Sequence, residues 1–260
     1  MKNIEIYCVT NKPIKFLEKT GYKLVGVGKD NFSKKYIKFN NKKNIYYKEK
    51  YYSELTFHYW LWKNLLDKKN GNLWIGLCQK RRFWLQNQKS KSKLLTSVPN
   101  EWKNYDAVIC KKLNLGTPKI SKILKRGWKN IIQSPNILYP NSKYNIQLHF
   151  DLFHGYGNLE KAINLIKRED REEFKQYVKV SNSFNPHIMC VAKPKILKLW
   201  FNDLFKWLKK CEAIFGFQNL KGYDTTRLYA YLAERYHSFW FKKYSRYIEW
   251  PYKFIETEKK

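Results

Sequence analysis

Three consecutive cations, Lys80-Arg81-Arg82, are the residues whose type and spacing point most directly to chemistry. An arginine guanidinium binds phosphate oxygens through a two-pronged fork, and a lysine ammonium adds a compact positive charge. Together such groups can offset the negative charge that develops on a departing diphosphate. An anionic small-molecule ligand is therefore the first hypothesis, and a solvated basic turn is the alternative for the same residues.

Transfer of a group to an acceptor hydroxyl also needs a general base, which must be a His, Asp or Glu near the acceptor. The candidates, which the sequence does not rank, are Glu54, Asp151, His154 and Glu234. Arg227 and Glu234 are two helical turns apart, so both lie on one face if a single helix contains them.

A metal site finds little support. The chain has no Asp-x-Asp motif, the paired carboxylates with which many nucleotide-sugar enzymes hold a divalent metal on the diphosphate. His149, Asp151 and His154 could ligate a metal, but no additional ligand is evident nearby. We expect that no cofactor is required, although the sequence is still compatible with a divalent metal.

The elements that must position these residues are predicted from hydrophobic spacing. Leu73–Leu77 is long enough for a buried strand and too short for a helix, and ligands of open α/β sheets bind outside the carboxyl ends of strands. Ile4–Val9 reads as a first strand before the turn Thr10–Pro13. Residues 53–66 and 194–211 have helical spacing. We therefore predict an α/β fold with a central, mostly parallel sheet flanked by helices and a helix-rich C-terminal part.

Helix boundaries follow from capping residues. Ser53 should cap the helix at 53–66, whose buried face would contain Leu55, Tyr59, Trp62 and Leu66. Asn158 should cap a helix that runs to Ile166, and Asp224 should cap a last helix from Thr225 to about Phe241. The segment that leads to Asn145 should form short helices.

Composition limits the class of protein. The 260 residues are 43% hydrophobic, which is enough for a substantial core. The five cysteines are odd in number and widely spaced, so a reducing cytoplasm fits best. The formal charge of +31 would attract nucleic acid, an anionic lipid surface or phosphorylated substrates, although a biased codon pool explains such a charge equally well. No signal peptide or membrane-spanning run is evident.

Several motifs follow one another in a fixed order along the chain. They are Tyr52-Ser53-Glu54-Leu55-Thr56, Tyr59-Trp60-x-Trp62-Lys63-Asn64, Ile75-Gly76-Leu77-Cys78-x-x-Arg81-Arg82-Phe83, Tyr105-Asp106-x-Val108-Ile109, Asn185-x-x-Ile188-Met189 and Leu232-x-Glu234-Arg235. This series resembles the DUF4422 family of bacterial capsule and exopolysaccharide glycosyltransferases, whose pattern is approximately (Y)xELTAxYWxWKN followed by YIGLxHYRRYF. The likeness covers nearly the whole chain.

The resemblance implies a single GT-A-like domain at 1–260, with a nucleotide-sugar-binding part at 1–115 and a helical acceptor-side part at 116–260. It implies transfer of a sugar, such as a UDP-linked hexose or galactofuranose, to a glycan or lipid-linked acceptor. The donor-binding residues would be Thr10, Asn11, Lys12, Lys80, Arg81, Arg82, Arg227 and Arg235. Such an enzyme would be cytoplasmic and could bind peripherally to an anionic membrane, with no specific nucleic-acid partner.

Departures from the family pattern keep two alternatives open. Gln79 and Lys80 replace the His-Tyr that usually precedes the double arginine, Asn72 stands where an acidic residue is common, and Asn158 takes the place of an Asp. A glycosyltransferase-like subunit that binds without turnover is one alternative. A basic nucleic-acid-binding protein is the other, but no RNA- or DNA-binding motif is evident.

Overall fold

The computed structural model describes residues 3–116, 128, 131–132, 135 and 144–257. The chain forms two compact units, the first from residues 1–111, 187–203 and 240–260 and the second from 112–186 and 204–239. Two long helices, α8 (Pro194–Phe215) and α10 (Leu228–Tyr244), have residues in both units. The first unit therefore includes later segments besides the N-terminal part, and the prediction of one domain stays a prediction.

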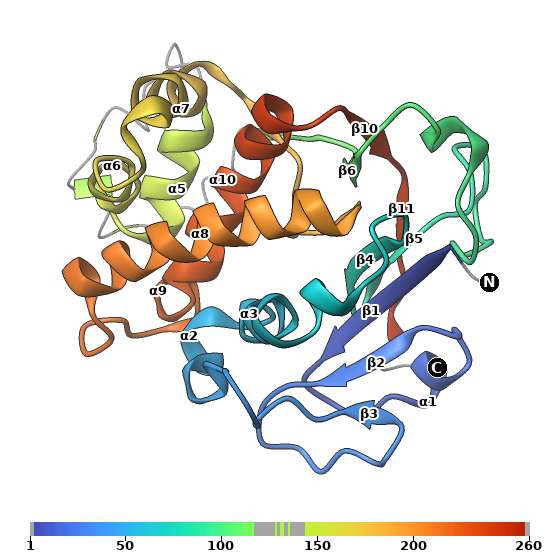
Figure 1. The fold of residues 1–260 in the computed structure, drawn as a ribbon. Helices are drawn as coiled ribbons and strands as arrows, with labels where there is room; N and C mark the ends of the chain where they lie inside the picture. Colours follow the sequence, from blue (N-terminus) through green and yellow to red (C-terminus); the bar gives the residue numbers. More distant parts are fainter. Residues whose placement is uncertain (1–2, 117–127, 129–130, 133–134, 136–143, 258–260) are drawn as a thin grey trace. The chain divides into compact units, whose positions relative to one another are not determined.

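A mostly parallel sheet forms the first unit (Figure 1). Among the described residues its strands are β1 (Ile4–Thr10), β2 (Lys23–Gly26), β3 (Tyr36–Ile37), β4 (Trp74–Gln79), β5 (Arg82–Trp84), β6 (Ala107–Cys110), β9 (Cys190–Ala192), β10 (Tyr247–Trp250) and β11 (Tyr252–Phe254). The order is β10-β6-β9-β4-β1-β2-β3, and β5 pairs with β4 and β11. β1 is parallel to β2 and β4, β2 to β3 and β6 to β10, whereas β9 is antiparallel to β4 and β6. The predicted α/β fold is confirmed.

The side chains of β1 show that apolar residues cover this sheet on both faces. Successive residues of a strand point to opposite faces, and strands covered on both faces are apolar throughout. Ile4, Ile6 and Cys8 enter one buried apolar cluster. Tyr7, between them, packs on the opposite face against Phe57 of the helix α3 (Leu55–Asn64), with ring centroids 5.3 Å apart. Burial of each large apolar side chain contributes about 1.5–3 kcal/mol.

The helical segments that lie wholly within the first unit are short, and they correct one prediction. Besides α3 they are α1 (Lys15–Glu18), α2 (Glu49–Tyr52) and the 3-10 turns Tyr46–Lys48, Leu66–Lys68 and Asn100–Trp102. Ser53 does not cap α3, because its backbone has a φ of 52° and the helix begins at Leu55 after Glu54. The predicted buried face is also wrong in part, since Tyr59 and Trp62 are only half-buried.

The second unit is mainly helical. Besides its parts of α8 and α10, its described elements are α5 (Ile146–His154), α6 (Asn158–Ile163), α7 (Arg168–Val180), α9 (Tyr223–Thr226) and the short paired strands β7 (Leu113–Asn114) and β8 (Ser183–Phe184). The short helices predicted between 117 and 143 lie almost entirely outside the described residues. None of the helices in the described part of the chain has the length and apolar run that a membrane span needs.

Two predicted caps in this unit are wrong. Asn158 is the first residue of α6, not its cap, and its side-chain amide donates back to the His154 carbonyl at 3.1 Å. The predicted last helix is broken at Arg227, where φ is −92° and ψ is 30°, into α9 and α10. Asp224 consequently lies inside α9.

Candidate functional site

The loops that follow β1 and β4 meet at one edge of the sheet. Because the two strands are parallel, their carboxyl ends share this edge. The Lys80 backbone N–H donates to the Val9 carbonyl at 3.1 Å. Thr10 is buried, and its Oγ1 donates to the Lys12 carbonyl at 2.6 Å and accepts from the Lys12 N–H at 3.2 Å. Asn11 and Lys12 are exposed, and they lie beside the turn Lys80-Arg81-Arg82, the cationic turn.

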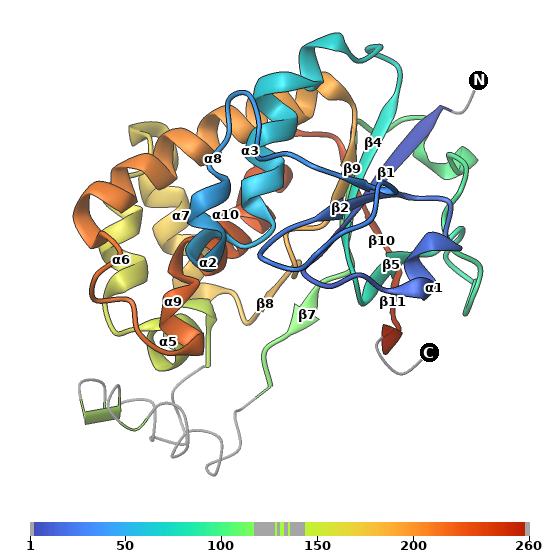
Figure 2. The ribbon, with the colours of Figure 1, turned by 90° about the horizontal axis from the view of Figure 1, so that it is seen from below.

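The cationic turn is a tight hairpin. Gln79 at the end of β4 pairs with Arg82 at the start of β5, so Lys80 and Arg81 form the connection. Figure 2 shows the C-terminal strand β11 beside β5. After β11, the Ile255 N–H donates to the Arg81 carbonyl at 2.9 Å, and the Thr257 hydroxyl donates to the Lys80 carbonyl at 3.0 Å. The C-terminal segment thus fixes this turn.

Both arginines of the turn have defined partners. Arg81 Nε lies 3.2 Å from Glu256 Oε1, and the two side chains are 34% and 40% exposed. Arg82 Nη1 donates to Gln79 Oε1 at 3.1 Å, and its guanidinium lies 5.7 Å from the centroid of the Phe254 ring. The turn is therefore more ordered than a solvated loop, and Glu256 partly neutralises it.

Glu54 lies at the same edge of the sheet through its contact with Gln79. The Gln79 amide nitrogen donates to Glu54 Oε1 at 2.5 Å and to the His187 carbonyl at 3.0 Å. The His187 ring is 3.3 Å from the Tyr252 hydroxyl through Nε2. His187 and Ile188 both have positive φ, of 75° and 52°. Positive φ is an outlier for a β-branched residue, and strain of this kind clusters at functional sites.

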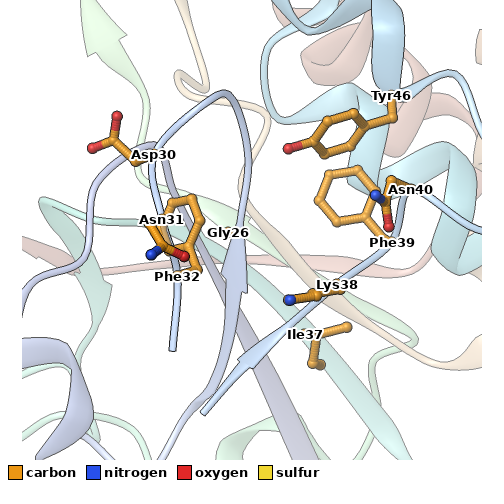
Figure 3. A pocket seen from close by; sticks show the side chains of 9 residues that line it. All are labelled: Gly26, Asp30, Asn31, Phe32, Ile37, Lys38, Phe39, Asn40 and Tyr46. Carbon is orange, nitrogen blue, oxygen red and sulfur yellow. The ribbon is translucent and has the colours of Figure 1, made fainter. Parts of the chain in front are cut away.

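A polar pocket lies at the carboxyl ends of β2 and β3 (Figure 3). The loop after β2 contributes Asp30, Asn31 and Phe32 on one side, and Phe39 and Tyr46 lie on the other. Gly26, Ile37, Lys38 and Asn40 complete the lining. Its volume is about 160 Å³. Ligand pockets usually measure about 300–1,000 Å³, so this one suits a single ring of a larger ligand.

In the second unit, α5 holds Asp151 and His154 in buried positions. His154 stacks on Tyr231 with ring centroids 3.7 Å apart, and its Nδ1–H donates to the Asp224 carbonyl at 2.9 Å. Burial, assisted by the charge of Arg235, lowers the pKa of His154 to about 3. Burial raises the pKa of Asp151 to about 6, although a hydrogen bond from the Gly157 N–H opposes the rise.

Arg235 is part of the core of the second unit. The side chain of this residue is 2% exposed and forms an ion pair with Glu234. One terminal nitrogen donates to His149 Nδ1 at 3.2 Å, and the guanidinium carbon lies 4.2 Å from the centroid of the Phe184 ring. These contacts compensate the buried positive charge of the Arg235 guanidinium within the helical unit.

The residues predicted from the sequence thus fall into two groups. The sheet unit holds Thr10, Asn11, Lys12, Glu54, Lys80, Arg81 and Arg82, and the helical unit holds Asp151, His154, Arg227, Glu234 and Arg235. Sequence reasoning missed His187, Tyr252 and Glu256, which come to the turn from later segments of the chain. Within the described residues, no group of three or more His, Cys, Asp or Glu side chains could hold a metal ion.

Comparisons with known proteins agree with this fold. A family model described as "Domain of unknown function (DUF4422)" matches residues 5–245. The solved structure titled "WbbM bifunctional glycosytransferase apo structure" superposes with a TM-score of 0.72 at 19% sequence identity. That alignment covers 97% of this chain and 45% of the other, so the chain spans less than half the length of that protein. No curated protein matches the chain.

Proposed function

This chain belongs to the DUF4422 family, and from that membership and its fold we propose that it is a glycosyltransferase. It moves a sugar from a nucleotide-sugar donor to a glycan acceptor during the synthesis of a polysaccharide or glycoconjugate. The observation that carries the proposal is the carboxyl edge of the parallel sheet, where a polar pocket follows β2 and β3 and the cations of the hairpin turn follow β4, with β1 between β2 and β4. In open α/β sheets this edge is the ligand-binding edge.

The donor is a UDP-linked hexose, with galactofuranose among the candidates. Its nucleoside would enter the pocket beside Asp30 and Tyr46, where polar groups and aromatic rings can hold a base or a ribose. Its diphosphate would bind Lys80, Arg81 and Arg82 together with the loop Thr10–Lys12. These cations can stabilise the leaving diphosphate, so the reaction requires no metal.

Glu54 is the general base that we favour. It lies in the same unit as the cationic turn and connects to Arg82 through Gln79. A general base works best with a pKa near the operating pH. His154, with a pKa of about 3, fits that task poorly, whereas Asp151, with a pKa of about 6, is the second candidate. Glu234 is engaged by Arg235.

The acceptor is a glycan on a lipid carrier, and the enzyme acts in the cytoplasm at the inner face of a membrane. The formal charge of +31 supports attraction to anionic lipids, to which each basic residue near the surface contributes about 1 kcal/mol. Vesicles that contain phosphatidylserine should co-sediment with the protein at low salt and release it at high salt. Equal sedimentation with neutral vesicles would argue against this attraction.

Thermal shift measurements test the donor. The panel consists of UDP-galactose, UDP-galactofuranose, UDP-glucose, UDP-N-acetylglucosamine and GDP-mannose, each with and without EDTA. A ligand that binds only the native state raises the midpoint by mass action. Arg81→Ala should then abolish binding of the stabilising nucleotide in calorimetry. A panel without any stabilising nucleotide would refute the proposal, and binding without turnover would indicate an inactive glycosyltransferase-like subunit.

A further inference from the structure

The side-chain amide of Gln79 is hydrogen-bonded at both its nitrogen and its oxygen at the end of β4. A glutamine amide has two N–H donors and one carbonyl acceptor. The donors go to Glu54 Oε1 and the His187 carbonyl, and the oxygen accepts from Arg82 Nη1. The amide therefore stands between a carboxylate and a guanidinium, with one end on each.

The partners permit only one orientation of this amide. A carboxylate and a backbone carbonyl can only accept, and a guanidinium can only donate. Rotation of the amide by 180° would turn its oxygen toward Glu54 and the His187 carbonyl and its N–H groups toward Arg82. All three hydrogen bonds would then be lost, so the chemistry of the neighbours fixes the side chain.

Strained backbone holds two of these partners in place. Ser53, directly before Glu54, has a φ of 52°. His187, whose carbonyl accepts from Gln79, has a φ of 75°, and Ile188 follows it with a φ of 52°. Residues other than glycine keep such conformations only where the surrounding structure imposes them, and they concentrate at functional sites. Both acceptors of the Gln79 nitrogen thus lie on or directly after residues with a constrained backbone.

We propose that Gln79 is a positioning residue that keeps Glu54 and Arg82 apart and oriented for sugar transfer. The inference rests on the proposed function. A carboxylate and a guanidinium in direct contact form a bidentate ion pair that occupies both groups. With the amide between them, Gln79 holds the carboxylate at its nitrogen end and the guanidinium at its oxygen end, in place of that ion pair. Gln79 would thereby take over the place of the histidine in the related sequence pattern.

Steady-state kinetics of three variants test this inference, with the panel nucleotide sugar that the wild type hydrolyses fastest as the probe. Gln79→Leu removes both hydrogen-bonding ends, and we expect kcat to fall about 100-fold, the loss typical of a misplacement by about 1 Å. KM and the thermal midpoint should stay near the wild-type values. Gln79→His offers one donor and one acceptor, so it should recover kcat to within about tenfold of wild type, equivalent to about 1.4 kcal/mol.

Gln86→Leu is the matched control, because Gln86 also joins two segments, through the Ser97 carbonyl and the Thr96 N–H, and these partners do not belong to the network of Gln79. Its kcat should not change. An unchanged kcat in Gln79→Leu, or a kcat that falls only in step with the thermal midpoint in both Gln79 variants, would overturn the positioning role while wild-type turnover stands. A wild type that hydrolyses none of the panel refutes the proposed function and, with it, this inference.

Discussion

The ion pair between Arg81 and Glu256 offers a direct test of the phosphate site. If Arg81 binds the donor diphosphate, the phosphate must compete with the Glu256 carboxylate, which lies 3.2 Å from Arg81 Nε. Glu256→Gln removes the competing charge and nearly keeps the shape of the side chain. We therefore expect the variant to bind UDP more tightly than the wild type does.

The size of the gain follows from exposure. Because the two side chains are 34% and 40% exposed, the pair belongs with surface salt bridges, which contribute about 0.2–1 kcal/mol. At about 1.36 kcal/mol per tenfold, this corresponds to a Kd for UDP lower by about 1.4-fold to 5-fold. The gain should shrink at high ionic strength, since salt screens exposed charges.

Calorimetric titration of UDP at two salt concentrations measures this effect. Glu249→Gln is the matched control, since it makes the same change in net charge and breaks the ion pair of Glu249 with Lys242, whose atoms are 3.9 Å apart. Glu249 lies on β10, at the opposite end of the strand order from the proposed nucleoside pocket. A weaker affinity in Glu256→Gln, or an equal gain in both variants, would refute Arg81 as a phosphate ligand that Glu256 competes for.

Three further predictions concern the folded state. Gly26→Ala should lower the unfolding free energy by about 1–3 kcal/mol, because the new Cβ would lie 2.5 Å from the Phe32 ring; Gly71→Ala, with no neighbour within 4 Å, is the control in urea unfolding. Burial lowers the pKa of His58 to about 3 from 6.5. Between pH 6.5 and about pH 3, the His58 side chain therefore binds a proton in the unfolded state but not in the folded state. The free energy of unfolding should fall by up to about 1.4 kcal/mol per pH unit as the pH drops through this range. Urea titrations at several pH values measure this dependence, and His58→Leu should make it less steep. The same pH dependence in the variant would contradict the lowered pKa of His58. Arg235→Ala should cost about 3–5 kcal/mol in urea unfolding, because it removes a buried guanidinium that forms an ion pair with Glu234. A loss below about 0.5 kcal/mol, as for surface residues, would contradict its place in the core.

Much of the fold was predictable because its signals are local. The buried strand at Ile4–Thr10 follows from a short, mainly apolar run, and the helix at Pro194–Phe215 follows from apolar spacing with a period of 3.6 residues. Capping was less predictable. Ser53 has the residue type of a cap, but its backbone has a positive φ and the helix starts later. Asn158 likewise donates backward to a carbonyl, a choice that depends on the preceding glycine turn.

The sequence alone determined the class of fold, the family resemblance and the cations at the end of β4, because short motifs and periodicity express these features. Only the tertiary structure decided what surrounds those cations. Gln79 touches a residue 25 positions earlier and another 108 positions later, and Lys80 accepts from Thr257 across 177 positions. Such pairings depend on how parallel strands and a C-terminal strand meet at one edge, which no local pattern of residues encodes.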